Sequence, residues 1–462
     1  MRLSKRQLML GALLVFVVAF AIFAVAHILP PAPYGLADDW RVFYAAAHVV
    51  QHGGNPYDAA TIHAAEQAAQ LYPKVQPSLD DFTDLPIVAV LLGAVAWLPY
   101  WLSFAVFTGL GALLAGIALR AWTREAGWDH AGLWLLAAMC SWLMLLGFFS
   151  GQFDALLLAG VVASLLLMRR NAAWLAGACM VVVLFKPHLL WPLPLLLFAA
   201  WSDDHRRAWR FAAAAGITIA GGAAAGFVVV PNSTSFFGHL FGFGGRVNVV
   251  QPDLSGIPGL LVRLPHGALI GAAVGVAGGI AVIALAWLAT RDARLRGTSG
   301  ESRALVPLVG LAVWLACTPY AHPNDDVLLY PLVVMLVGER GALLDGHRLQ
   351  LALLAALAAL AAFLSTPALG YALLVLGAGL LIALRGRVQV STIAGLALAA
   401  LAVLPAIWPF HVLNVSLTPV AVSLTALAGW LQLRARLAAA LPGRQASSGH
   451  LTATRVVHSV SS

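Results

Sequence analysis

Short polar segments between long apolar stretches carry most of the residues in this sequence that could do chemistry. A carboxylate can act as a general base towards a hydroxyl group that it reaches by a hydrogen bond. A lysine, a histidine or an arginine can bind a phosphate, the lysine as a compact point charge. Both kinds of group are present, so these segments are candidates for a reaction at a hydroxyl group beside a bound phosphate. Their main members are Asp38, Asp39, Trp40, Arg41, Gln152, Asp154, Lys186, His188, His322, Asp325 and Asp326.

Asp39, or its neighbour Asp38, is the candidate general base. It stands at the start of an alanine-rich stretch that is typical of a helix, where an acid can also be a helix cap or a solvated loop residue. Arg41 is close enough in sequence to hold an acidic neighbour ionised. Trp40 suits the aromatic belt of a membrane interface, or it could stack on a sugar. Both interpretations stay open for these residues.

Lys186 is the lysine that lies inside an apolar stretch. A lysine at a helix end can extend its charge to the membrane surface, or it can contact a lipid phosphate or diphosphate. His188 follows closely and could share the second role, and for His322 we expect a contact with a phosphate or a sugar hydroxyl group. Asp325 and Asp326 resemble metal ligands at first sight. Helix capping explains them, and no further His or Cys spacing supports a metal, so we predict no metal site.

Three further polar residues have two interpretations each. Gln152 and Asp154 could cap a helix or bind sugar hydroxyl groups. Arg246 ends the glycine-rich segment Gly242-Phe243-Gly244-Gly245-Arg246 and is either a surface residue or a contact on a mobile loop. The sequence has no P-loop, GxSxG, HExxH or dinucleotide-binding pattern in a credible context. A reaction driven by a cytosolic nucleotide is therefore not expected.

The composition requires a membrane around these segments. Of the 462 residues, 61% are hydrophobic and 10% are charged, whereas about a quarter of a soluble domain is charged. The net charge of +8 does not indicate nucleic-acid binding, because the basic residues form short clusters between apolar runs, as they do where helices are oriented in a membrane. The 3 cysteines lie within apolar stretches and lack CxxC or metal-ligand spacing.

Apolar stretches that could cross or enter a bilayer recur along the chain. In lipid the backbone must satisfy its own hydrogen bonds, so we predict an all-α polytopic bundle with about 12 transmembrane helices. The first stretch lacks a small-x-small cleavage site and is read as a retained helix rather than a signal peptide. The stretch at 86–121 is too long for one helix, and 172–201 is expected to be a tight pair. The predicted spans are 8–29, 86–121, 131–149, 152–168, 172–201, 208–230, 267–290, 304–320, 325–337, 350–364, 367–384, 390–408 and 414–432.

The basic residues predict how the helices are oriented. If the amino terminus is cytoplasmic and the spans alternate, 22 of the 27 basic residues fall on the cytoplasmic side, as the positive-inside rule requires. Both termini are then cytoplasmic in a multi-pass protein of the cell membrane, whether inner or plasma membrane. The candidate residues and two long loops, at 30–85 and 231–265, fall on the non-cytoplasmic side.

We predict one transmembrane domain over residues 1–440, followed by a disordered cytoplasmic tail over 441–462, which is polar and rich in Ser and Thr. Within the first long loop, residues 38–71 form an alanine-rich amphipathic stretch interrupted by Gly53-Gly54-Asn55-Pro56. Glycine and proline end helices, so two short surface helices are expected there.

Several short motifs follow one another along the chain. They are Asp39-Trp40-Arg41-Val42-Phe43-Tyr44-Ala45-Ala46-Ala47, Gly53-Gly54-Asn55-Pro56-Tyr57-Asp58, Gly151-Gln152, Arg169-Arg170, Leu175-Ala176-Gly177, Lys186-Pro187, and Thr318-Pro319-Tyr320 with Asp325. In type and order they resemble the motifs of glycosyltransferase family 87, and the resemblance covers roughly residues 10–340. This family of GT-C type enzymes uses polyprenol-phosphate sugars and includes mycobacterial phosphatidylinositol mannoside mannosyltransferases.

The sequence departs from the family pattern at two places. Thr83-Asp84-Leu85-Pro86 stands where the family usually has an aromatic-x-Pro sequence, and His188 follows Lys-Pro where glutamine is common. These departures bear on the donor sugar and the acceptor more than on the type of reaction.

The resemblance implies an inverting transfer of a sugar, typically mannose, from a polyprenyl phosphate to a lipid or glycan acceptor outside the cytoplasm. Asp39 would be the base, with Asp38 as its alternative. Cationic side chains would stabilise the leaving phosphate, namely Lys186, His188, His322 or Arg246. The partners would be the sugar donor, the acceptor and membrane lipids, with no cofactor, no metal and no nucleic acid. The residues expected to bind the sugar or the acceptor are Gln152, Asp154, Trp40, Arg41 and Tyr44.

Two other classes of function compete with this one. A lipid or polysaccharide transporter or flippase would favour inverted repeats and polar residues at the membrane midplane, whereas no repeat is visible here and the charges gather at one face. An acyl- or phosphoethanolamine-type transferase would need a Ser or Thr nucleophile or a metal cluster, and neither is convincing. The transporter is the alternative that we carry forward.

Overall fold

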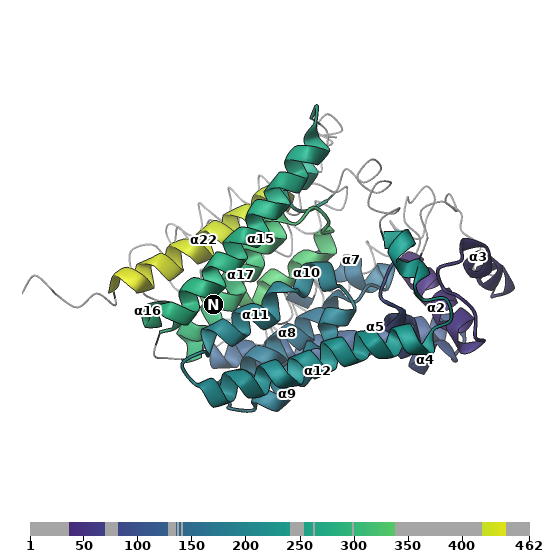
Figure 1. The fold of residues 1–462 in the computed structure, drawn as a ribbon, viewed down its shortest axis with the longest axis horizontal. Coiled ribbons are helices and arrows are strands. Elements are labelled where there is room, and N and C mark those ends of the chain that lie inside the picture. Colours follow the sequence, from purple (N-terminus) through teal and green to yellow (C-terminus); the bar gives the residue numbers. More distant parts are fainter. Residues whose placement is uncertain are drawn as a thin grey trace, which may run out of the picture.

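The computed structural model describes residues 37–69, 82–127, 135, 138–139, 142–240, 254–261, 264–297, 300–337 and 418–439. Throughout these residues the regular elements are helices, as the sequence predicts (Figure 1). The expected span at 8–29, the spans between 350 and 408, Arg246 and the tail from 441 lie outside the described residues.

Three of the described helices are long and apolar enough to cross a membrane. They are α5 (Tyr100–Glu125), α12 (His205–Val229) and α15 (Gly267–Arg291). Large apolar side chains on all three stay exposed, among them Leu113, Ile217 and Leu269. A contiguous apolar surface of this extent needs lipid as its solvent, which agrees with a membrane protein. The total of about 12 spans remains a prediction.

Prolines divide two of the expected long stretches. α4 (Pro86–Ala96) ends before Pro99, and α5 begins directly after it, because a proline disfavours helical geometry in the residue that precedes it. The prediction that 86–121 is more than one helix is thereby confirmed. The stretch at 172–201 divides further than the expected pair, into α9 (Ala173–Ala178), the 3-10 helix η2 (Cys179–Leu184), α10 (Pro187–Leu190) and α11 (Pro192–Ala200).

The central helix of the bundle is α8 (Asp154–Arg169), most of whose residues are buried. α5 and η2 pack against it. The contact with η2 is close because Gly160 has no side chain; a Cβ there would lie 2.3 Å from a methyl carbon of Val182. α12 approaches α9 in the same way at Gly177, where a Cβ would lie 2.6 Å from the carbonyl oxygen of Phe211.

A second group of helices lies beside this one. α15 and α22 (Thr418–Ala439) both pack on α17 (Gly300–Cys317) (Figure 1). α11 joins the two groups because it contacts α12, α15 and α17. Short elements complete the described fold: α7 (Trp142–Ser150), α14 (Ile257–Leu261), α16 (Ala293–Arg296), the 3-10 helix η3 (Pro323–Leu329) and α18 (Tyr330–Val337).

The first long loop contains two helices, as predicted, but the first of them is not on the surface. α2 (Asp38–Gln51) and α3 (Ala59–Ala68) are separated by the expected glycine-containing break, with Gly53 at φ +74°. Trp40, Phe43 and Ala46 of α2 are buried, and the helix packs on α4 and α7. The expectation of a surface helix is therefore wrong for α2, because its apolar face is part of the protein core.

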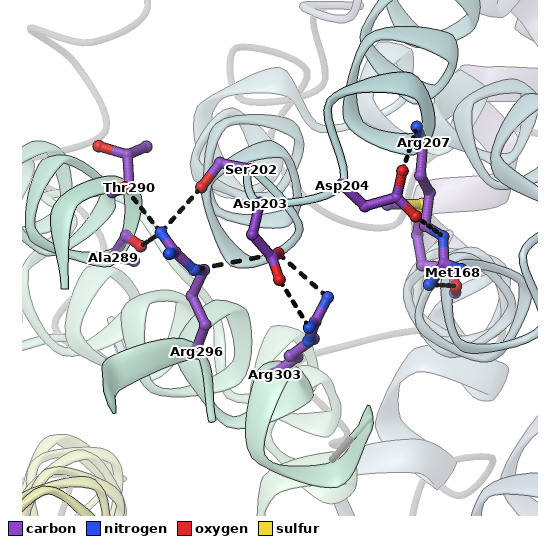
Figure 2. A network of polar contacts seen from close by, with 9 residues as sticks. All are labelled: Met168, Ser202, Asp203, Asp204, Arg207, Ala289, Thr290, Arg296 and Arg303. Atoms are coloured by element: carbon purple, nitrogen blue, oxygen red, sulfur yellow. Dashed lines mark hydrogen bonds and ion pairs between the residues drawn. The ribbon is translucent and has the colours of Figure 1, made fainter. Parts of the chain in front are cut away.

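Basic side chains gather at one end of the bundle. Asp203, in the turn between α11 and α12, lies 2.8 Å from Arg303 and 3.9 Å from Arg296 (Figure 2). Arg296 also donates to the carbonyl oxygens of Ala289 and Thr290 at the end of α15, at 2.7 and 2.6 Å. Side chains that the sequence assigns to one side of the membrane thus meet at one end of the fold.

The same end holds the carboxyl terminus of α8 and the amino terminus of α12. Arg169 and Arg170 pair with Glu125 at 3.0 and 2.6 Å, and Arg207 donates to Asn171 at 2.9 Å. α8 therefore runs from Asp154 at the opposite end to this basic end, and α17 runs from the basic end towards Cys317. The fold thereby gives the molecule two chemically different ends.

We predict that Arg296→Ala destabilises the fold while Arg294→Ala does not. The first substitution leaves helix-terminal carbonyl oxygens without their donor, at a cost of about 1–3 kcal/mol. Arg294 is exposed and bonds only to its neighbour Asp292 among the described residues. Thermal unfolding of both purified variants in detergent measures the difference. Equal melting temperatures for the two variants would contradict the prediction.

Candidate active site

Lys186 lies at a break between two helical segments, at the end of the bundle opposite the basic cluster. Its backbone is not helical (φ −138°, ψ 73°), because it precedes Pro187, the first residue of α10. The side chain is only 7% exposed. Lys186 is therefore buried in the protein interior, at the point where two helical segments are separated.

Two carboxylates hold the ammonium group of Lys186. Its Nζ lies 3.0 Å from Asp154 Oδ1 and 2.6 Å from Asp325 Oδ1, and both aspartates are almost completely buried. Asn324 donates to the second oxygen of Asp154 at 2.8 Å. Removing three charges from water is unfavourable unless their bonding groups are satisfied, and this arrangement satisfies them.

The second oxygen of Asp325 belongs to a capping box at the start of η3. Asp325 Oδ2 accepts a hydrogen bond from the backbone N–H of His322 at 2.7 Å. The backbone N–H of Asp325 donates to the carbonyl oxygen of His322 at 2.9 Å. One carboxylate thus connects the buried lysine to the histidine, which is partly exposed.

Aromatic rings continue from His322 towards the surface. The rings of Tyr320 and His322 lie 4.9 Å apart, edge to face, and those of His188 and Tyr320 lie 5.5 Å apart. The Tyr320 ring therefore contacts both histidine rings.

Asp39 lies in the first turn of α2 and is partly exposed. Two contacts fix the start of this helix: the backbone N–H of Ala37 donates to the carbonyl of Phe149, and the Tyr100 hydroxyl donates to the carbonyl of Ala37 at 2.7 Å. Gly151 allows the close approach, since a Cβ there would lie 2.5 Å from Trp40 Cβ. The amino-terminal end of a helix favours an acidic residue, and Asp39 stands at such a position.

Asp84 belongs to the same neighbourhood, although sequence reasoning assigned it no role at the site. It lies two residues before α4, and its carbonyl oxygen accepts a hydrogen bond from the Tyr57 hydroxyl at 2.7 Å. Burial raises the pKa of the Asp84 carboxyl to about 7; the Lys186 charge lowers it and the Asp39 charge raises it. An acid directly before an apolar helix was the available signal, in the segment that departs from the family pattern.

Several of the residues predicted to bind a sugar are buried and make contacts within the protein. The Trp40 indole is fully buried and stacks on Phe107, with ring centres 4.4 Å apart. Arg41 is also buried and donates to Glu66 at 3.0 Å. The Tyr44 hydroxyl donates to the carbonyl of Leu98 at 3.0 Å. We therefore leave these three out of the binding set proposed below, together with Asp154, both of whose oxygens accept hydrogen bonds.

Gln152 differs from that group in its exposure, since Trp40, Arg41 and Tyr44 are buried. It is partly exposed, and its Oε1 is a buried atom that has no hydrogen-bond partner among the described residues. A buried carbonyl oxygen without a donor is unfavourable by about 1–3 kcal/mol, so this atom suits a ligand that brings a hydroxyl or N–H group.

The remaining predicted residues are placed only in part. Asp38 is the first residue of α2, but its side chain lies outside the described part of the structure, and so does Arg246.

Ser255 is a further polar residue that sequence reasoning missed. It is buried and donates to Asp326 at 3.2 Å, and its backbone N–H donates to the carbonyl of Ala321 at 2.8 Å. Asp326 is therefore a buried structural acid.

A comparison with protein families supports the resemblance. The model of glycosyltransferase family 87 matches residues 82–319, about half of the chain. Neither a curated protein nor a solved structure matches the chain significantly. The matched region contains Asp84, Gln152 and Lys186, whereas Asp39 and His322 lie outside it.

We predict that Lys186→Met strongly destabilises the fold. It leaves two buried carboxylates facing each other without their cation, which costs about 3–5 kcal/mol for a buried pair that loses one partner. The double variant Lys186→Met with Asp154→Asn removes one of the opposed charges and should recover part of the loss. Thermal unfolding in detergent measures both. A Lys186→Met protein that melts like the wild type would contradict the prediction.

Proposed function

The chain belongs to glycosyltransferase family 87, and we propose that it transfers a sugar from a polyprenyl phosphate to a hydroxyl group of a lipid or glycan acceptor. Family membership and the exposed apolar helices make it a membrane glycosyltransferase. For the sugar we propose mannose, in line with the mannosyltransferases that the sequence resembles. Membership of a transferase family also favours this function over the transporter alternative.

One observation carries the proposal: acidic, basic and hydrogen-bonding groups meet at one end of the bundle. Lys186 pairs with Asp154 and Asp325, and the start of α2, which carries Asp39, is bonded to the end of α7 close to Asp154 in the chain, although these residues are far apart in sequence. The end is also where α8 begins and where α17 ends. A base and several donors thus share one site at the boundary of the apolar bundle.

In the proposed reaction Asp39 is the general base. The acceptor oxygen attacks the anomeric carbon of the sugar while its proton moves to the Asp39 carboxylate. The bond between the anomeric carbon and the phosphate oxygen breaks, and its electron pair leaves with the polyprenyl phosphate. A single displacement of this kind inverts the configuration at the anomeric carbon.

The leaving phosphate gains negative charge, so preorganised donors would stabilise it most as the bond breaks. We assign this role to His322 and the exposed His188, whose rings both lie near the Tyr320 ring. We include Arg246 as a further phosphate contact from the second long loop. Lys186 would act on the phosphate only through its positive charge and without direct contact, since its described bonds go to carboxylates.

The sugar or the acceptor would use the free oxygen of Gln152. Its buried Oε1 lacks a donor among the described residues, and a sugar hydroxyl group would supply one. The polyprenyl chain would lie along the apolar outer surface. We place this end of the bundle on the non-cytoplasmic face of the cell membrane and the arginine-rich end in the cytoplasm, because basic clusters are retained there.

We predict that Asp39→Asn lowers the rate of sugar transfer by about 10²–10⁴-fold, since the amide cannot take the acceptor's proton. The measurement is incorporation of radiolabelled sugar from polyprenyl-phosphate mannose and its glucose counterpart, in membranes that contain equal amounts of each variant.

Asp292→Asn is the matched control, because this acid lies at the basic end and is expected to leave transfer unchanged. An active Asp39→Asn enzyme beside an inactive Asp38→Asn enzyme would move the base by one residue. If the wild type consumes none of the lipid-phosphate sugars, the proposed function is wrong.

The orientation has its own prediction. In a background in which the 3 native cysteines are replaced by alanine, Ala64→Cys on α3 should react with a membrane-impermeant maleimide in intact cells. Arg206→Cys at the start of α12 should react only after permeabilisation; both positions are exposed. The reverse pattern would place the site in the cytoplasm.

A further inference from the structure

We propose that the arginine-rich end of the bundle carries a binding site for an anionic phospholipid, on the face where α12 and α15 flank α11. The lipid phosphate binds Arg206, Arg210 and Arg291, and the acyl chains cover Leu195 and Phe198 of α11. The site lies at the opposite end from the candidate active site, and its existence is independent of the reaction proposed above.

The three arginines differ from others at this end in having no acidic partner. Arg303, for example, lies 2.8 Å from Asp203 (Figure 2). Arg206, Arg210 and Arg291 are exposed, and in the part of the chain that the structure describes no carboxylate pairs with them. An arginine binds a phosphate through parallel hydrogen bonds, so these three positive charges are available to an anionic ligand.

Exposed tryptophans stand beside these arginines. Trp209 is 64% exposed, and its spacing of three residues from Arg206 and one from Arg210 puts the three side chains on one side of α12. On α15 the guanidinium carbon of Arg291 lies 4.3 Å from the ring centre of Trp287, which is 52% exposed. Tryptophan rings prefer the level where headgroups meet acyl chains, so the neighbouring arginines lie at the level of the lipid phosphates.

The outer face of α11 connects the two groups. The rings of Phe198 and Trp209 lie 5.4 Å apart, and a Cβ at Gly279 of α15 would lie 3.9 Å from the Trp191 ring. Trp191, Leu195 and Phe198 follow one another at helical spacing and so share the face that α12 and α15 flank (Figure 1). Leu195, in the middle of this face, is 38% exposed. This apolar surface is the part of the site that suits acyl chains.

Charge complementarity decides which lipid occupies the site. A zwitterionic lipid brings a second cation next to its phosphate, which the three arginines repel, whereas an anionic lipid brings only negative charge. In the orientation proposed above this end faces the cytoplasm, where basic clusters at the membrane surface attract anionic lipids. The occupant is therefore a lipid of the phosphatidylglycerol type and not phosphatidylcholine.

We predict that the double variant Arg206→Gln with Arg210→Gln weakens binding of dioleoyl phosphatidylglycerol by about ten- to thirtyfold, given what two basic side chains contribute at a lipid surface. The affinity for dioleoyl phosphatidylcholine should change little. Native mass spectrometry of the full chain, purified in detergent and titrated with each lipid, measures both affinities. A wild type that binds the two lipids equally well would overturn the proposal.

The chain offers a matched control on α5. Arg120 and Arg124 are also exposed, four residues apart and at the same end of the bundle, but the neighbouring Trp122 is buried. Arg120→Gln with Arg124→Gln removes the same charge and should leave the affinity for phosphatidylglycerol close to that of the wild type. If the two double variants lose affinity equally, net charge alone governs binding and the proposal is wrong.

Photochemical cross-linking locates the acyl chains. A phosphatidylglycerol with a diazirine in one acyl chain should label α11 around Leu195 in the wild type and in the α5 control variant. The label at this position should be lost in the Arg206 and Arg210 variant. Peptide mass spectrometry identifies the labelled residues, and labelling spread evenly over the apolar helices in all three proteins would contradict the proposal.

Discussion

The site depends on one buried cation that is shared by two carboxylates. Lys186 connects Asp154, at the start of α8, with Asp325, in η3, so segments that are distant in sequence meet at a single ammonium group. Because an unpaired charge in this interior is strongly unfavourable, the three segments can be stable only together. The same requirement fixes Asn324 and His322, whose bonds occupy the remaining oxygens of the two aspartates.

The apolar bundle explains why such a cluster lies at an end rather than in the middle. Helices in lipid satisfy their own backbone hydrogen bonds, and ionisable groups are tolerated where helices begin, end or break. Asp39 begins α2, Asp154 begins α8 and Lys186 occupies the break before Pro187. The arginines gather at the other end, around Asp203 and Glu125. The apolar surfaces of the helices and the location of the charges at the helix ends are therefore both consequences of the surrounding lipid.

These constraints show how much could be predicted from the sequence. Apolar periodicity predicts the helices, and the prolines at 99 and 187 predict where they break, because both signals are local. The convergence of residues 154, 186 and 322 at one end follows from alternating spans. The burial of α2 could not be predicted: Trp40 and Arg41 look amphipathic and available in the sequence, and only tertiary contacts with Phe107 and Glu66 show that they are occupied.

At the site, the sequence could least predict which charged side chains form ion pairs with one another. Lys186 has the residue type of a phosphate ligand, and nothing local shows that Asp154 and Asp325 saturate it. Asp84 is the converse case, since its position before α4 looks like a helix boundary, while its surroundings raise the pKa of its carboxyl to about 7 through burial and the charge of Asp39. Neighbouring acids in different environments can take different roles. In the proposed reaction the base is Asp39, in the first turn of α2, and the raised pKa of Asp84 reduces the negative charge that a bound phosphate would meet beside it.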